Sequence, residues 1–196
     1  TDTSGTITGL SNGRTYTFTV ATRNVAGAGP DSAPSSRVVP LSVPGAPSNV
    51  LAHMNGTSVS LGWTAATDNG GSDLRGYDIT PYRGTTALPS KHTWSTNASI
   101  SGLTPGETYT FAVTAVNNQG SSPAATSDPL VVVWVPDAPA SLHVEPGHRS
   151  LTISWAEPAD IGGRPILGYE VVVGSADSTF QELLPAEPTE FTLDGL

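Results

Sequence analysis

The chain contains no cysteine among its 196 residues. It therefore has no disulfide, no thiol nucleophile and no thiolate zinc site, and its stability has to come from packing. Basic residues are also scarce, because eight Lys and Arg stand against 17 Asp and Glu, which gives a formal charge of −9. A nucleic-acid-binding surface normally carries a basic stripe, so this charge argues against nucleic acid as a partner.

Long apolar runs and chemical motifs are missing too. The sequence has no run of about 18 apolar residues that would indicate a membrane span, and it does not begin like a signal peptide. Its four His lack the spacing of a zinc motif. The loop Asp68–Asp73 is rich in oxygen ligands, but its spacing matches no calcium loop. Glu157 and Asp160 have no nucleophilic or basic partner, so we expect no enzyme, no cofactor and no metal site.

Turn-forming residues are abundant, with 21 Gly and 17 Pro. This composition, without helical periodicity, predicts an all-β protein with many turns. The clearest strand lies within Gly102–Gly120, where Tyr109, Phe111 and Val113 alternate with Thr and Ala. Such alternation is typical of a strand with one buried face.

The same stretch is repeated along the chain. Gly9–Gly27 is an earlier copy, and Leu10, Leu103 and Leu196 recur at an interval of 93 residues. Each copy begins with a tight turn, Ser11-Asn12-Gly13 or Thr104-Pro105-Gly106. We therefore predict a partial unit at 1–41, a complete unit at 42–134 and a second partial unit at 135–196.

Each unit can be divided into strands. In the complete unit we predict seven: Asn49–His53, one with Val59, Leu61 and Trp63, one with Tyr77 and Ile79, His92–Ser95, Ala98–Ser101, the Tyr109 strand and Leu130–Val133. The first unit should hold the last three strands, Thr6–Thr8, Tyr16–Arg23 and Ser36–Leu41. The third should hold early strands with Leu142 and Val144, with Leu151, Ile153 and Trp155, and with Tyr169, Val171 and Val173, followed by Phe191 and Leu193. The predicted core of the complete unit is Leu61, Trp63, Tyr77, Tyr109, Phe111 and Val113.

Several of these features together resemble a known family. Trp63 with Tyr77, the turn GLTPGETY, the strand end AVNNQG, and Pro44 with Pro47 look like a fibronectin type III domain, and Pro136, Pro139, Trp155 and Tyr169 repeat the pattern. The resemblance implies tandem immunoglobulin-like, seven-stranded Greek-key sandwiches, in which Tyr109 forms a tyrosine corner with nearby backbone. Thr-rich, cysteine-free modules of this kind are similar to those of secreted bacterial enzymes, surface proteins and phage tails. An extracellular location, or alternatively a virion tail, is therefore expected.

Two functions fit this reading. The first is a non-catalytic spacer in a longer repeat array, whose partners are the neighbouring domains; Trp134 and Pro136 in the connector should then pack between domains. The second is an adhesion module that binds a polysaccharide or a protein through its loops or through Trp94, Tyr82 and His92. Trp94 has a competing interpretation, that it covers the edge of its own sandwich. Integrin-type recognition is excluded, because the sequence has no Arg-Gly-Asp.

The two partial units also suggest self-association. Residues 1–41 carry three Arg and two Asp, net +1, whereas 136–196 carry ten acidic residues and two Arg, net −8. Together they amount to one domain, so we expect the free chain to associate head to tail, although an excerpt from a longer array would look the same. Asn55-Gly56-Thr57 and Asn97-Ala98-Ser99 match the glycosylation pattern, but such triplets arise readily by chance here and no glycan is assumed.

Overall fold

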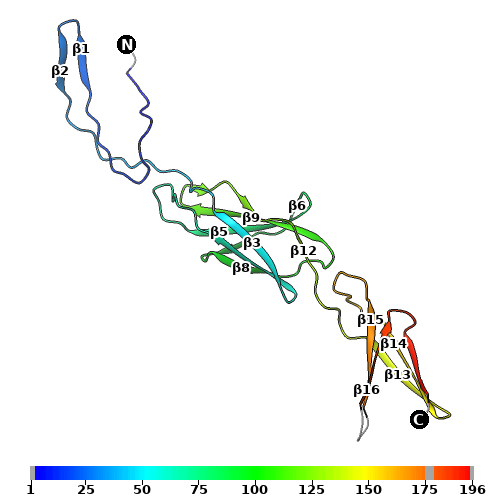
Figure 1. Ribbon diagram of the computed structural model, residues 1–196. Coiled ribbons are helices and arrows are strands. Elements are labelled where there is room, and N and C mark those ends of the chain that lie inside the picture. The colour runs from blue at the N-terminus through cyan, green and yellow to red at the C-terminus, as the bar shows by residue number, and fades with distance from the viewer. Residues whose placement is uncertain (1–2, 175–178, 195–196) are drawn as a thin grey trace. The chain divides into compact units, whose positions relative to one another are not determined.

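The computed structural model describes residues 3–174 and 179–194. These residues form strands and no helix, which confirms the prediction of an all-β protein (Figure 1). The strands are β1 (Ala21–Asn24), β2 (Gly27–Asp31), β3 (Ser48–Asn55), β4 (Ser58–Thr64), β5 (Gly76–Arg83), β6 (Thr86–Ala87), β7 (Lys91–Thr93), β8 (Asn97–Ile100), β9 (Thr108–Asn117), β10 (Gly120–Ser121), β11 (Ala125–Thr126), β12 (Leu130–Val131), β13 (Ala140–Gly147), β14 (Ser150–Ala156), β15 (Gly168–Gly174), β16 (Thr179–Pro185) and β17 (Glu190–Asp194). Across the described ranges, no helix is available that could cross a membrane.

The chain divides into two compact units, and the division passes through the middle repeat. The first unit comprises Thr1–Ala52, Ser60–Ser99 and Thr110–Asp128, and the second comprises His53–Val59, Ile100–Tyr109 and Pro129–Leu196. The middle repeat itself contains two sheets. One has the strand order β3-β4-β8, and in the other β9 lies between β5 and the short strands β10, β11 and β12, while β6 and β7 pair with β5.

The core of the middle repeat follows the alternation of its sequence. Along β4 and β5 every second side chain is buried, as period two requires for a strand that covers a core. The same alternation runs the length of β9, where Phe111 and Val113 have no exposed surface. All six predicted core residues are buried, which confirms that prediction: Leu61, Trp63, Tyr77, Tyr109, Phe111 and Val113.

The last strand of the middle repeat differs from the prediction. Instead of Leu130–Val133, three two-residue strands, β10, β11 and β12, pair in turn with β9. Pro123 and Pro129 interrupt them, because proline has no N–H to give to a strand ladder. Between the pieces, serine hydroxyls continue the pairing: the N–H of Ala115 donates to Ser122 Oγ (2.9 Å) and the N–H of Phe111 donates to Ser127 Oγ (3.1 Å).

The first 41 residues form less regular structure than predicted. The structure does not form the three expected strands, Thr6–Thr8, Tyr16–Arg23 and Ser36–Leu41, so this prediction is wrong. Instead, β1 pairs with β2 in a hairpin, and Tyr16 and Val38 meet only in an isolated bridge. The physical reason is the absence of a covering sheet among the described residues. Val20 is 72% exposed, so alternation here marks a potential buried face without burial to hold it in a strand.

The last repeat has a small core and an open side. β14 lies between β13 and β17, and β15 pairs with β16, a strand that was not predicted. Trp155, Tyr169, Ile153 and Val171 are buried together. In contrast, Leu142 on β13 is 71% exposed. An apolar cleft of about 640 Å³ is lined by residues of β13, β14 and β15.

Candidate functional sites

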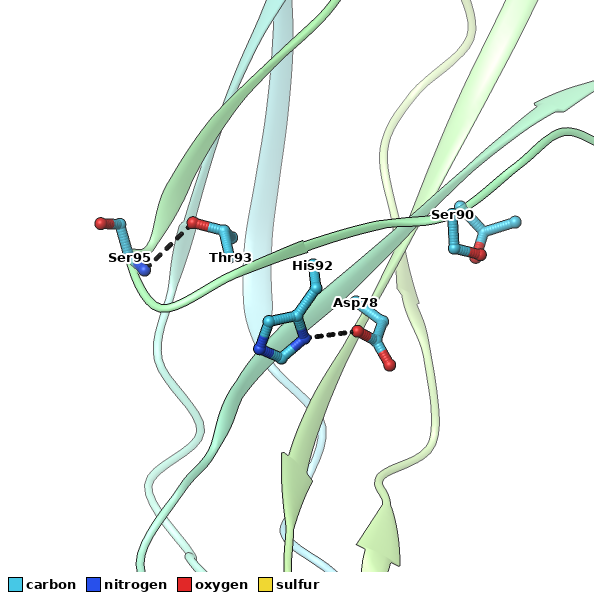
Figure 2. Close-up of polar contacts among 6 residues, drawn as sticks. Asp78, Ser90, His92, Thr93 and Ser95 are labelled. Atoms are coloured by element: carbon cyan, nitrogen blue, oxygen red, sulfur yellow. Dashed lines mark hydrogen bonds and ion pairs between the residues drawn. The ribbon is translucent and has the colours of Figure 1, made fainter.

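The first candidate site lies on the exposed face of β5 and β7. These strands are antiparallel, and their register places Asp78 opposite His92. His92 Nδ1 donates to Asp78 Oδ1 over 2.7 Å, as Figure 2 shows. Both side chains are more than one third exposed, so water weakens the attraction of this pair.

The residues predicted for an aromatic platform are only partly brought together. The rings of His92 and Trp94 pack edge to face with centroids 5.5 Å apart, and Trp94 is 72% exposed. Tyr82 pairs with Ala87, four positions along β5 from Asp78. At about 3.3 Å per strand residue, that separation is about 13 Å. The structure thus adds Asp78 to His92 and Trp94, and it leaves Tyr82 further along the strand.

The second candidate site is the connector that precedes β3. Backbone hydrogen bonds join this connector to the loop after β4: the N–H of Ser42 donates to Gly70 O (2.9 Å), and that of Gly45 donates to Asp68 O (2.8 Å). Asn117, which is 4% exposed, donates its side-chain amide to the carbonyl oxygens of Ser42 and Asn69. Connector and loop are therefore held by the same buried amide.

The oxygen atoms of that loop organise the loop itself. Asp68 Oδ1 accepts from the N–H of Gly70 over 2.8 Å, and Asn69 Oδ1 accepts from the N–H of Gly71 over 2.9 Å. These are local turns closed by side chains. In the part of the chain that the structure describes, no three His, Cys, Asp or Glu side chains are grouped so that they could hold a metal ion.

The connector that precedes β13 repeats this arrangement. The N–H of Trp134 donates to Gly162 O (3.1 Å), and the N–H of Asp137 donates to Asp160 O (2.8 Å). In addition, Trp134 Nε1 donates to Asp160 Oδ2 over 3.0 Å. Pro136 is exposed and borders the apolar cleft. Asp160 was singled out in the sequence only as a loop carboxylate; its alignment with Asp68 at an interval of 92 residues was the signal for this role.

Two tyrosines at equivalent places in the repeat, Tyr16 and Tyr109, each accept a hydrogen bond from the turn before them. The N–H of Thr104 donates to the hydroxyl oxygen of Tyr109 over 3.0 Å, and the N–H of Ser11 donates to that of Tyr16 over 2.9 Å. The geometry is that of a tyrosine corner. The family model of the fibronectin type III domain matches residues 45–133. This part of the chain is a fibronectin type III domain.

Relatives of this fibronectin type III domain and its flanking segments occur in larger proteins. The chain is 34% identical over 140 residues to Endoglucanase B of Cellulomonas fimi, which covers 67% of this chain and 13% of that protein. It is 38% identical over 138 residues to Chitinase A1 of Niallia circulans, covering 65% of this chain and 18% of that protein. It is also 33% identical over 170 residues to human Neogenin, covering 78% of this chain and 11% of that protein.

Solved structures agree on the fold. Domains d3–d4 of the rat CD45 extracellular region superpose with a TM-score of 0.50 at 14% identity, over 66% of this chain and 69% of that one. The chain spans less than a fifth of the length of the curated relatives named above. A fibronectin type III domain is not itself catalytic, and the enzymes among these relatives are matched only over that small share.

Proposed function

We propose that the chain is a structural spacer from a longer extracellular array, with partial fibronectin type III repeats at 1–41 and 135–196 on either side of the complete repeat at 42–134. Its partners are then the neighbouring domains of the same polypeptide. Relatives with enzyme names support this role, since they contain much more sequence than the matched segment. The chain also shares its fold with domains of a solved extracellular region, and this fold is compatible with the proposed extracellular location.

One observation carries the proposal: both connectors are bonded through their backbone to the loop of the repeat that follows. The pairs Ser42–Gly70 and Trp134–Gly162 are equivalent, as are Gly45–Asp68 and Asp137–Asp160. A glycine-serine connector would leave its ends free to rotate, whereas a short connector with bonded backbone restricts them. A module that keeps other domains at a set distance needs this restriction.

Small-angle scattering in solution tests the spacer. We expect the distribution of interatomic distances of the intact chain to stay the same between low and high salt. A test variant in which residues 41–44 are replaced by a Gly and Ser segment of the same length should show a broader distribution. If the parent chain and this variant give the same distribution, the connectors set no distance and the proposal is wrong.

The exposed indole of Trp94 favours a second candidate function, binding of a polysaccharide. Aromatic rings combine apolar area with a polar edge, and Trp94 next to the His92–Asp78 pair offers both. Soluble polysaccharides such as cellulose oligomers and chitin oligomers should then quench tryptophan fluorescence in the parent chain but not in Trp94→Ala. Equal quenching in both proteins, or none in either, counts against this function.

A further inference from the structure

We propose that the Gly-Gly loop of each repeat is a docking site for the glycine turn of the repeat before it; we call this contact a junction. In each junction a side-chain hydrogen bond of the connector residue, which we call the lock, holds the contact. The lock is made with a different partner in each of the two junctions. The inference rests on the proposed spacer function and specifies how that function is built. The loops are Asp68–Gly71 and Asp160–Gly163, and the turns are Ser11–Gly13 and Thr104–Gly106. No ligand is involved: the occupant of each loop is a neighbouring repeat.

Backbone approaches backbone in both junctions. A Cβ atom added to Gly13 would lie 3.0 Å from Gly71 Cα, and one added to Gly106 would lie 3.2 Å from Gly163 O. A Cβ on Gly71 or on Gly163 would collide with the backbone nitrogen of the opposing turn glycine. Gly71 and Gly163 also share a φ of +79°, a conformation that residues with a side chain rarely adopt. Glycine is therefore required on the loop side at equivalent positions of both junctions.

The lock of the first junction joins turn to connector. Asn12 Nδ2 donates to Ser42 Oγ over 2.8 Å. Ser42 Oγ in turn donates to Val43 O over 3.0 Å, so the hydroxyl has a fixed orientation. The bond connects residues 30 positions apart, one from each of the two elements that must stay aligned.

The second junction has a different lock at the equivalent place. Pro105 stands where the first turn has Asn12, and proline carries no side-chain donor. Trp134 stands where the first connector has Ser42, and its Nε1 donates instead to Asp160 Oδ2 over 3.0 Å. The bond has thus moved from turn–connector to connector–loop, while the backbone contacts are the same. Ser42 and Trp134 thus each make one side-chain bond of this kind, and in the first junction the amide of Asn117 also donates to Ser42 O and Asn69 O.

This exchange predicts a specific rescue. Trp134→Ser removes the second lock, and Pro105 cannot supply the first. Adding Pro105→Asn to Trp134→Ser recreates the pair that Asn12 and Ser42 form, and Asn12 shows that this turn accepts asparagine. The double variant should therefore regain the alignment that the single variant loses. A merely structural role of the Trp134 ring would not be restored by an asparagine on another segment.

Pulsed electron spin resonance between two nitroxide labels measures the alignment directly. Because the chain has no cysteine, cysteines placed at exposed Thr86 and exposed His148 take the labels uniquely. We expect a narrow distance distribution in the parent, one at least twofold wider in Trp134→Ser, and a return to the parent width in the double variant. Trp94→Ser is the matched control, since it also removes an indole, and it should keep the parent width. Far-ultraviolet circular dichroism verifies that every variant is folded.

The outcomes separate this inference from the spacer function. If the parent distribution is narrow but Trp134→Ser does not widen it, or if the double variant stays as wide as the single one, the lock is wrong and the spacer stands. If the parent distribution is itself broad, the repeats are not held in one orientation, and both ideas fail.

Discussion

Trp63 and Tyr77 pack edge to face in the middle repeat, with ring centroids 5.5 Å apart and ring planes at 66°. Trp155 and Tyr169 repeat the contact in the last repeat at 5.1 Å and 63°. Edge-to-face packing of this kind contributes beyond the area that the rings bury. Trp63 Nε1 is buried and has no hydrogen-bond partner among the residues described here, so Trp63 acts through its apolar surface.

Trp63→Ala should lower the free energy of unfolding of the middle repeat by about 3 to 5 kcal/mol, because it leaves a cavity where an indole packs against Tyr77. Chemical denaturation followed by circular dichroism measures the loss. Trp94→Ala is the control, and with 72% of Trp94 exposed we expect it to cost less than about 0.5 kcal/mol. A loss below about 1 kcal/mol for Trp63→Ala would refute its place in the core.

Ser127→Ala should lower the free energy of unfolding by about 1 to 3 kcal/mol, because the N–H of Phe111 loses its acceptor in a buried place. Ser32 makes the same kind of bond, with the N–H of Val20 over 3.1 Å, but in an exposed segment. In Ser32→Ala, water replaces the hydroxyl, so unfolding of the middle repeat should not change. Equal effects of the two substitutions in denaturation experiments would contradict the importance of the buried bond.

Tyr77 should make stability depend on alkaline pH. Burial raises the pKa of its hydroxyl above the usual 10.0, and a backbone hydrogen bond with Ala66 acts in the opposite direction. A raised pKa means that the folded state holds this proton more tightly than the unfolded state. The stabilisation is therefore fully present below pH 10.0 and is lost as the pH rises through the folded-state pKa.

Tyr77→Phe keeps the aromatic ring and removes the titrating proton. We expect the free energy of unfolding to fall more steeply above pH 10.0 in the parent chain than in this variant. Urea denaturation at several pH values between neutral and alkaline measures both slopes. Identical slopes would show that the Tyr77 proton is not linked to folding.

The 196-residue polypeptide, when free in solution, should associate head to tail. The apolar cleft of about 640 Å³ in the last repeat is bordered by Ile153, Trp155 and Val171, and it suits the alternating apolar side chains of the Tyr16–Val20 segment of a second copy, which is not part of a regular strand in its own chain. Light scattering at increasing concentration should show a rising mass, and deletion of residues 1–41 should abolish the rise. A monomer mass at high concentration would overturn this prediction.

The sequence was sufficient where the determining interactions are local or periodic. The alternation of apolar residues correctly predicted that Phe111 and Val113 are in the core, and the turn before Tyr109 correctly predicted the tyrosine corner. It was insufficient where burial depends on what covers a strand: Val20 and Leu142 alternate like buried residues but are exposed. The pattern describes a strand's own two faces, and it contains no information on whether another sheet lies against one of them.

The candidate sites were predictable only in part, for a related reason. Trp94 and Trp134 stood out by residue type and by position in the repeat. The carboxylates of these sites did not: Asp78 meets His92 through strand register, and Asp160 meets Trp134 across 26 residues. Register and loop closure are set by tertiary packing. A single sequence therefore identifies the donors His92 and Trp134 more readily than their acceptors.

The broken edge beside β9 has a consequence for neighbouring repeats during folding. Similar sequences joined in one chain are at high local concentration, and an unpaired regular edge strand would let one repeat pair with the next. Here the edge consists of β10, β11 and β12, each two residues long and interrupted by proline. Between these short strands, serine hydroxyls accept hydrogen bonds from the backbone N–H groups of β9. These N–H groups are therefore not available to pair with the strand of a neighbouring repeat. Pro123 and Pro129, which make the observed edge differ from the predicted strand, thus disfavour an exchange of strands between neighbouring repeats.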